Sequence, residues 1–498
     1  MEWRLLPKWI TPEHIVCTWK DSPGIAFLDS SDNVNPRGRY SFVGCEPFLR
    51  CIYHDSVVVL EWKNGLREVC ADPWQTLRNL LNTYRIQDPF SRDLPAGAAI
   101  GYLSYDLGME IEGVKSNAHG VSGWPLFELH FYDLLFCFSR QGGENCVVST
   151  GFPLLEPGKR RRHARNRLNE VFGRLNGTSW DNGLEEPGAC VRDGLFECTL
   201  ESNFDCPTYC ASIRRIKEYI AAGDVYQVNL SQSFSGEIEA GGWSTYRYIR
   251  QRNRVPFGAY LRSGTREILC FSMERFLRMQ GNMIETRPIK GTRPRGRTQE
   301  EDLRLSRELR ASGKDQAELV MIVDMERNDL GKVCKPGTVR VKRLFEVEQY
   351  ATVFHLVSTI TGTLAEGADQ IDCMKACLPG GSITGAPKIR AMEIIDELEG
   401  IKREVYCGAI GYFGFNGVSD FNIPIRTIQK EGKRIRFNAG GGVLYDSDPE
   451  DEYRETLHKV RSFIECLSSA QCPGPWENAI SWKEYGDMHV DTGEWKNM

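Results

Sequence analysis

The ten residues from Val225 to Phe234 constrain the fold of this chain most, because apolar and polar side chains alternate along them. The apolar positions are Tyr226, Val228, Leu230 and Phe234, and the polar positions are Gln227, Asn229, Ser231 and Ser233. Successive side chains of a strand point to opposite faces, so this pattern predicts a strand with one face on a core. The other face is polar enough to line a binding site.

Further helices and strands are predicted on both sides of this strand. A helix with Ile213, Ile216 and Ile220 on one face ends at Gly223, and an amphipathic helix is expected at 164–175. Helices are also predicted at 299–312, 315–327, 386–398 and 450–467. Strands are predicted at 268–272, 284–290, 338–344, 352–361, 407–415, 422–428 and 434–439. This mixture favours a large α+β unit in which helices cover long sheets.

The composition is that of a globular protein, since 41% of the 498 residues are hydrophobic and 26% are charged. The net charge of −5 argues against binding nucleic acid through bulk charge. The N-terminus lacks the apolar region of a secretory signal, and no apolar run is long enough for a membrane-spanning helix. The 17 cysteines follow neither a zinc nor a thioredoxin pattern, which is typical of reduced thiols. We therefore expect a cytoplasmic protein without nucleic-acid or membrane partners.

Local composition divides the chain into four regions. Residues 1–154 are rich in predicted strands, and 155–202 form a linker or insertion that begins with a basic run and ends in a polar stretch. Residues 203–468 carry the clearest motifs, which makes this region the candidate catalytic part. The tail, 469–498, has no regular pattern.

Lys290 lies between Pro288 and Gly291 in the segment from Arg287 to Arg293. The rigid proline and the permissive glycine restrict the backbone around the lysine. Burial or nearby cations would lower the pKa of Lys290 and supply the neutral amine that nucleophilic catalysis needs. The alternative is a lysine that points into water, which the local sequence alone favours.

The glycine-rich segment from Leu378 to Lys388 precedes a predicted helix. Thr384 is a candidate helix cap, and Pro387 suits the first helical turn. Free N–H groups at such a helix start can bind an anion, although the spacing differs from that of a P-loop. A purely structural cap is an equally good explanation.

Three carboxylates are candidate ligands of a metal ion. Glu452 and Glu455 lie on one face of the predicted helix 450–467, together with Lys459. Glu318 lies in an apolar segment, where a lone charge is costly unless it is paired or bound to a metal. Carboxylates with open water positions suit Mg²⁺. A solvated helix N-terminus is the alternative for Glu452 and Glu455.

Two polar residues in apolar strands and a glycine run complete the candidates. His355 is more commonly a core histidine with satisfied hydrogen bonds than a site residue. Arg426 needs an acidic partner or an anionic ligand in such a strand. The run from Gly440 to Gly442 supplies backbone that side chains cannot crowd.

In their order along the chain, these motifs resemble the chorismate-utilising enzymes, which include anthranilate, aminodeoxychorismate, isochorismate and salicylate synthases. The resemblance is specific over about 205–468, and residues 1–154 resemble more weakly the N-terminal region of anthranilate synthase component I. Aminodeoxychorismate synthase component I is the most similar member, because Lys290 stands where anthranilate synthases typically carry Ala. The segment from Gly381 to Lys388 is also similar to that member. Gln227 stands where the water-using members place a Lys as general base.

The resemblance implies an α+β fold in which two large antiparallel β-sheets pack as a sandwich with helices outside. It implies amination of chorismate at C4, with ammonia from a separate glutamine amidotransferase subunit, to give 4-amino-4-deoxychorismate for p-aminobenzoate and folate biosynthesis. Lys290 would attack C2 of chorismate, and Glu274 would protonate the leaving hydroxyl group. Mg²⁺ would be held by Glu318, Glu452 and Glu455. The substrate would be bound by Gln227, Thr292, His355, Thr384, Tyr406, Arg426, Gly440, Gly442 and Lys459.

Two departures from the family pattern stand near these residues. Met273 replaces the usual Pro, and Pro424 interrupts the predicted strand that holds Arg426. Within the family, the alternative function is anthranilate synthase component I of tryptophan biosynthesis. Outside the enzymes, the alternative is a regulator that binds chorismate or tryptophan. Glu274 and Lys290 argue against such a regulator, because pure binding needs neither.

Overall fold

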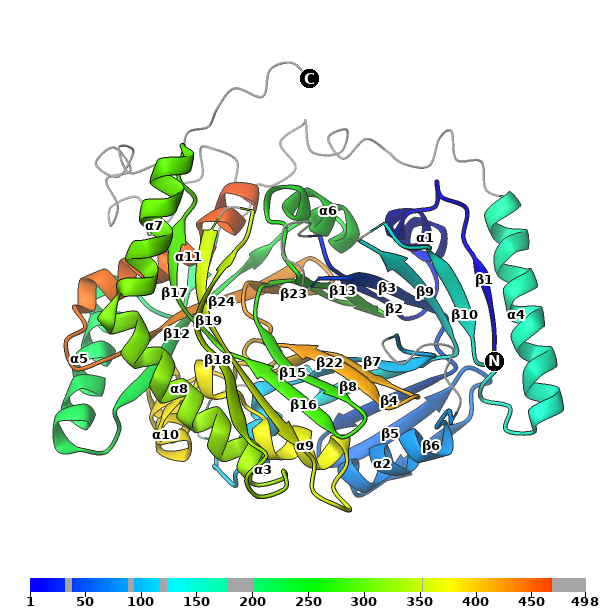
Figure 1. Ribbon diagram of the computed structural model, residues 1–498, viewed down its shortest axis with the longest axis horizontal. Coiled ribbons are helices and arrows are strands. Elements are labelled where there is room, and N and C mark those ends of the chain that lie inside the picture. Colours follow the sequence, from blue (N-terminus) through cyan, green and yellow to red (C-terminus); the bar gives the residue numbers. More distant parts are fainter. Residues whose placement is uncertain are drawn as a thin grey trace.

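Two antiparallel sheets of 12 strands each lie face to face, with the helices around their outer sides (Figure 1). The computed structural model describes residues 1–31, 38–87, 94–116, 118, 123–140, 142–177, 200–351 and 353–467. Residues 178–199 of the predicted linker and the whole predicted tail lie outside these described residues. The arrangement confirms the α+β sandwich that the sequence predicts.

Sheet 1 contains strands from both the beginning and the end of the chain. In spatial order its strands are β1 (Glu2–Leu5), β10 (Cys146–Ser149), β9 (Leu134–Ser139), β3 (Tyr40–Cys45), β2 (Ile25–Asp29), β13 (Phe257–Ser263), β14 (Arg266–Ser272), β23 (Thr427–Glu431), β24 (Arg434–Val443), β12 (Gln227–Glu237) and β11 (Glu201–Ser202), with β20 (Gly385–Ala386) beside β12.

Sheet 2 is built in the same mixed way. In spatial order its strands are β17 (Ile289–Pro294), β19 (Val353–Thr363), β16 (Met283–Arg287), β15 (Arg275–Gln280), β22 (Val418–Asn422), β21 (Ala409–Gly414), β7 (Ala98–Leu103), β8 (Phe127–Tyr132), β4 (Leu49–His54), β5 (Val57–Trp62) and β6 (Arg67–Cys70), with β18 (Arg340–Gln349) beside β19.

The helices cover the outer faces of the sandwich. They are α1 (Pro12–Trp19), α2 (Pro73–Thr83), α3 (Tyr105–Ile111), α4 (Pro157–Gly177), α5 (Cys206–Ala222), α6 (Gly242–Arg252), α7 (Gln299–Ala311), α8 (Gly313–Gly331), α9 (Gln370–Cys377), α10 (Lys388–Glu399) and α11 (Pro449–Leu467), with a short 3₁₀ turn, η2 (Gly381–Ile383). One apolar core lies under α5, α6, α10 and α11, and a second lies under α2, α8 and α9. A third, smaller core lies between the two sheets.

The N-terminal region and the candidate catalytic region share both sheets. In sheet 1, Phe27 of β2 lies opposite Tyr260 of β13. In sheet 2, Gly101 of β7 lies opposite Gly411 of β21. The boundary near 154 is therefore a division of the sequence that both sheets cross.

Most of the predicted elements are present, with three differences near the candidate site. Tyr226 was expected on the apolar face of a strand, but it precedes β12 and is 72% exposed. The predicted strand 284–290 is two strands, β16 and β17, because Pro288 has no N–H for the ladder. The predicted strand 422–428 is not one strand. β22 ends at Asn422 in sheet 2 and β23 begins at Thr427 in sheet 1, because the chain crosses from one sheet to the other between them.

No helix in the described part of the chain is long and apolar enough to cross a membrane.

Candidate active site

A cleft of about 730 Å³ contains most of the residues that the sequence predicts for a site. Strands β17 and β24, helices α8 and α11, the turn η2 and two connections between the sheets contribute to its walls. Its predicted site residues are Glu274, Lys290, Thr292, Glu318, His355, Tyr406, Arg426, Gly440, Gly442, Glu452, Glu455 and Lys459.

Glu274 and Arg426 are placed by two connections that run side by side between the sheets. One connection joins β14 to β15 through Glu274, and the other joins β22 to β23 through Arg426. The Ile423 N–H donates to the Glu274 carbonyl oxygen at 3.1 Å, and the Phe271 N–H donates to the Arg426 carbonyl oxygen at 3.0 Å. Arg426 has a φ of 51°, a conformation that few non-glycine residues adopt. The crossing therefore brings a carboxyl group and a cation from distant segments into one cleft.

The Glu274 carboxyl group is buried and ready to donate a proton near neutral pH. The residue is 4% exposed, and its Oε1 has no hydrogen-bond partner among the described residues. Burial raises the pKa of Glu274 to about 7, although the neighbouring Ser382 and Lys290 oppose this rise. A carboxyl group with such a pKa can act as an acid and then as a base.

A β-bulge at Gly291 places Lys290. Lys290 lies opposite Leu356 and Thr292 lies opposite His355, which leaves Gly291 as an extra residue with a φ of 73°. A Cβ atom at Gly291 would lie 2.8 Å from the Asp315 carboxyl carbon, so only glycine fits. Burial lowers the pKa of Lys290, even though Glu318 Oε2 lies 3.9 Å from its Nζ and opposes the shift. The interpretation of Lys290 as a lysine in open water is therefore wrong.

The three predicted metal ligands line the cleft but are held separately. Lys459 Nζ lies 2.7 Å from Glu455 Oε1 and also donates to the Gly440 carbonyl oxygen at 2.8 Å. The Ser447 hydroxyl donates to Glu452 Oε1 at 2.7 Å. Burial raises the pKa of Glu318 and of Glu452, whereas Lys459 lowers that of Glu455.

The oxygen atoms of these carboxylates are the type of ligand that a hard cation prefers. Their spacing in this structure, however, does not form a metal site. Within the described residues, no three His, Cys, Asp or Glu side chains are grouped closely enough to hold a metal ion. Glu455 nevertheless raises the pKa of both Glu318 and Glu452, so the negative charges repel one another. A divalent cation bound by oxygen donors would relieve this repulsion. Binding of Mg²⁺ stays a prediction.

His355 is neutral and presents one ring nitrogen without a partner. Its Nδ1 lies 3.0 Å from the Thr292 hydroxyl oxygen, and its buried Nε2 has no hydrogen-bond partner in the described part of the chain. Burial and the nearby Arg426 lower the pKa of His355 to about 4. The histidine is therefore only half satisfied, unlike a purely structural core histidine.

Arg426 is a partly buried cation that faces the same cleft. Burial lowers its pKa, and no carboxylate of the described residues forms an ion pair with it. Arginine in this situation suits an anionic ligand such as a carboxylate. Tyr406, which is 5% exposed, lines the same cleft.

Two predicted site residues, Gln227 and Thr384, do not line the cleft. A Cβ atom at Gly442 would lie 2.0 Å from Gln227 Nε2 and 3.2 Å from Lys290 Nζ, so the Gln227 amide lies close to the lysine although Gln227 is not part of the cleft wall. Thr384 neither caps α10 nor faces the cleft. Its buried hydroxyl donates to the carbonyl oxygens of Gly380 and Gly381, because the turn folds back on itself.

Two further cleft residues were not singled out from the sequence. Asn438 is 3% exposed, and neither atom of its amide group has a partner among the described residues. It lies on the same face of β24 as Gly440 and Gly442, so strand periodicity could have found it. Ser382 belongs to the predicted glycine-rich segment and lies beside Glu274. Its hydroxyl likewise has no hydrogen-bond partner in the part of the chain that is described.

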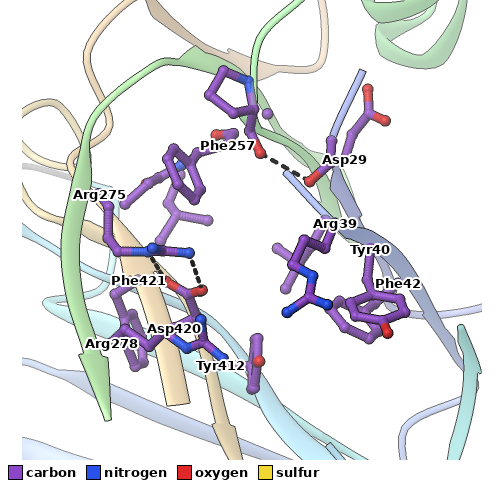
Figure 2. Close-up of a pocket in the computed structure, with 17 residues that line it drawn as sticks. Asp29, Arg39, Tyr40, Phe42, Phe257, Arg275, Arg278, Tyr412, Asp420 and Phe421 are labelled. Atoms are coloured by element: carbon purple, nitrogen blue, oxygen red, sulfur yellow. Dashed lines mark hydrogen bonds and ion pairs between the residues drawn. The ribbon is translucent and has the colours of Figure 1, made fainter. Parts of the chain in front are cut away.

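A second pocket, of about 90 Å³, lies between the two sheets and differs in its charges (Figure 2). There Arg275 donates to both carboxylate oxygens of Asp420, each at 3.0 Å. Asp29 accepts from Arg140 at 3.2 Å and from Arg250 at 3.0 Å. The Arg275–Asp420 pair joins two neighbouring strands of sheet 2, and the pairs of Asp29 join β2 to the end of β9 and to helix α6.

Comparison with known proteins gives a consistent result. Residues 33–465 match the family model described as chorismate binding enzyme. Aminodeoxychorismate synthase component 1 of Escherichia coli K12 is 37% identical over 449 residues, which cover 89% of this chain and 93% of the relative. Anthranilate synthase component 1 of Acetivibrio thermocellus is 33% identical over 467 residues, which cover 92% and 93%.

Solved structures show the same fold. Anthranilate synthase component I from Streptococcus pneumoniae TIGR4 has a TM-score of 0.75 at 28% identity, and the match covers 86% of this chain and 92% of that one. The isochorismate synthase MenF from Escherichia coli has a TM-score of 0.69 at 18% identity and covers 94% of each chain, which shows the fold alone. With its cleft and its relatives taken together, the chain belongs to the chorismate-binding enzyme family.

Proposed function

We propose that this protein is an aminodeoxychorismate synthase component 1, which replaces the C4 hydroxyl group of chorismate by an amino group. The product, 4-amino-4-deoxychorismate, would serve p-aminobenzoate and folate biosynthesis. Membership of the family alone does not select this reaction, because relatives with both the aminodeoxychorismate and the anthranilate synthase names match at 33–37% identity.

The position of Lys290 carries the proposal. Its amine lines the cleft beside Gly442, and burial lowers its pKa, which increases the fraction of the neutral, nucleophilic form. The resemblance of its segment to aminodeoxychorismate synthases adds support, since anthranilate synthases typically carry Ala there. An alanine has no group that could attack the ring.

In the proposed reaction, Lys290 is the nucleophile and Glu274 is the general acid and base. The neutral Lys290 amine attacks C2 of chorismate, the ring double bond shifts, and the C4 hydroxyl group leaves as water with the proton of Glu274. Ammonia then attacks C4, the double bond shifts back, and the C2–N bond to Lys290 breaks. Glu274, now a carboxylate, takes up the proton that ammonia loses, so the enzyme returns to its starting state.

The remaining cleft residues bind and orient a dianion. Arg426 and the backbone at Gly440 and Gly442 would receive one carboxylate, while Thr292, His355 and Tyr406 would line the ring. Glu318, Glu452 and Glu455 would hold Mg²⁺, which supplies positive charge for the other carboxylate. Lys459, which donates to Gly440, adds a fixed cation on this side.

Ammonia would come from a partner. The relatives are named component 1, and the sequence shows no cysteine nucleophile with the histidine and glutamate expected of a glutaminase. We therefore propose that a separate glutamine amidotransferase subunit supplies the ammonia. We also propose a cytoplasmic location. The isolated chain should use ammonium salts at high pH and ignore glutamine.

A product assay tests the proposal. The protein is incubated with chorismate, ammonium chloride and Mg²⁺, and the products are separated by liquid chromatography with mass detection. We expect 4-amino-4-deoxychorismate without pyruvate. Formation of anthranilate and pyruvate would instead support the second candidate, anthranilate synthase component 1, which the structural similarity to such an enzyme keeps in consideration.

A further inference from the structure

Glu326 is a buried carboxyl group that the proposed reaction does not use. It lies on α8 and is 2% exposed. Its Oε2 accepts a hydrogen bond from the Thr286 hydroxyl at 3.2 Å, and its Oε1 accepts one from the Gly381 N–H at 3.2 Å. One side chain therefore connects a helix, strand β16 and the turn η2.

The turn that Glu326 holds is part of the cleft wall. Gly381 is followed by Ser382, which lines the cleft next to Glu274. The turn also packs tightly on the helix, because a Cβ atom at Gly381 would lie 3.1 Å from Met325 Cε and 3.4 Å from Glu326 Oε1. A small movement of Gly381 would thus move Ser382 relative to the proposed acid.

A second buried side chain fixes the other end of the same turn. Lys388 Nζ donates to the Pro379 carbonyl oxygen at 2.9 Å and forms an ion pair with Asp329. Glu326 and Lys388 therefore hold the residues on either side of Gly380. An apolar side chain at 326 could fill the same space on α8, but it could not accept the Gly381 N–H.

We propose that Glu326 is a positioning residue, whose carboxyl group holds the turn from Gly380 to Ser382 so that the Ser382 hydroxyl stays beside Glu274. The proposal rests on the proposed function, in which Glu274 is the acid. The charged groups that face Glu326 are Asp329, Lys388 and Glu274. Burial and Asp329 raise the pKa of Glu326 to about 7, so a neutral amide is a fair substitute for the partly protonated carboxyl group.

Three variants separate positioning from simple packing. Glu326→Gln keeps an oxygen that can accept the Gly381 N–H, Glu326→Leu removes it, and Glu326→Asp shortens the side chain so that it cannot reach both partners. The matched control is Asp324→Asn, which removes an exposed carboxylate from the same helix. Misplacement of a catalytic group by about 1 Å costs about 100-fold in rate. We therefore expect kcat to fall about 100-fold in Glu326→Leu, clearly in Glu326→Asp, and only slightly in Glu326→Gln, with little change in KM.

Amide hydrogen exchange at Gly381 gives a readout that does not depend on turnover. The Gly381 amide should exchange faster in Glu326→Leu and Glu326→Asp than in Glu326→Gln or Asp324→Asn. Equal kcat in Glu326→Asp and the wild type would overturn the proposal, and so would an equal loss in Glu326→Gln and Glu326→Leu. If the wild type makes no 4-amino-4-deoxychorismate, the proposed function fails first, while the exchange data still decide whether Glu326 holds the turn.

Discussion

Glu274 and Arg275 are neighbours in the chain but face two different regions. Buried charges form close ion pairs in the region of Arg275, whereas Glu274 faces a cleft in which some charged groups have no such partner among the described residues. Arg275 lies in the pocket between the sheets, where Asp420 and Glu285 offset the cost of burial and raise its pKa (Figure 2). Glu274 lies in the cleft, where burial raises its pKa and Oε1 finds no partner among the described residues.

The same contrast holds for the other charges of the two regions. Asp29 in the pocket is bound by Arg140 and Arg250, whereas Arg426 in the cleft has no carboxylate partner in the described part of the chain. Buried charges that are paired stabilise the protein or specify its packing, and buried charges left unpaired cost stability unless a ligand compensates them. The difference indicates that the cleft, rather than the pocket, is built for a charged substrate.

Loss of the Lys290 amine should have the largest effect on the cleft. Lys290→Ala should lower turnover by on the order of 1000-fold, because the nucleophile is gone. Lys290→Arg should not restore it, since guanidinium stays protonated. Intact-protein mass spectrometry without ammonia should detect a wild-type adduct of chorismate minus water at Lys290. An active Lys290→Arg enzyme without an adduct would contradict the covalent mechanism.

Removal of divalent metal should lower turnover through the cleft and should leave the pocket between the sheets unchanged. EDTA followed by dialysis should lower turnover to background, and Mg²⁺ should restore it, because the carboxylates Glu318, Glu452 and Glu455 repel one another without a cation. Glu455→Gln should lower activity without unfolding the protein. Glu450→Gln, on an exposed position of the same helix, is the control. Full turnover in EDTA would remove the metal assignment.

The Glu274 proton should set the pH dependence of the wild type. Because its pKa is raised to about 7, the acid form persists up to neutral pH and is lost as the pH rises further. We therefore expect kcat/KM, measured with saturating ammonia, to decline as the pH rises above about 7, which is the alkaline limb of the pH profile. Glu274→Gln should lower kcat by on the order of 100-fold and abolish this limb. An unchanged limb in the variant would assign it to another group.

Substitution of one arginine in each region tests the comparison most directly. Arg426→Met should lower kcat/KM for chorismate by on the order of 100-fold, without lowering the free energy of unfolding, because it removes no ion pair among the described residues. Arg275→Met leaves Asp420 unpaired and should lower the free energy of unfolding by about 3 kcal/mol, while the KM for chorismate stays near that of the wild type. Urea denaturation and steady-state kinetics measure both. The reverse pattern would mean that the pocket binds the substrate.

The sequence by itself determined the local elements of the molecule. The alternation from Val228 to Phe234 gave a real strand, Gly223 ends α5 in the left-handed conformation, and the face of α11 carries Glu452, Glu455 and Lys459 into the cleft. These features depend on side-chain periodicity and on the backbone preferences of single residues, which neighbouring residues are sufficient to fix. Chemical type and spacing also identified Lys290, Glu318, His355, Arg426, Glu452 and Glu455 as cleft residues, while Glu274, Thr292 and Tyr406 were implied by the family resemblance.

Only the tertiary structure decided which buried groups find partners. Arg426 was expected inside a strand, but it lies where the chain changes sheets, and Thr384 turns its hydroxyl into its own loop. Asn438 and Glu326 differ from other buried polar residues only in what surrounds them. Pairing of strands far apart in sequence, such as β2 with β13, sets these surroundings. Hydrogen bonds and ion pairs depend on distances of a few ångströms between remote segments, and no local pattern encodes them.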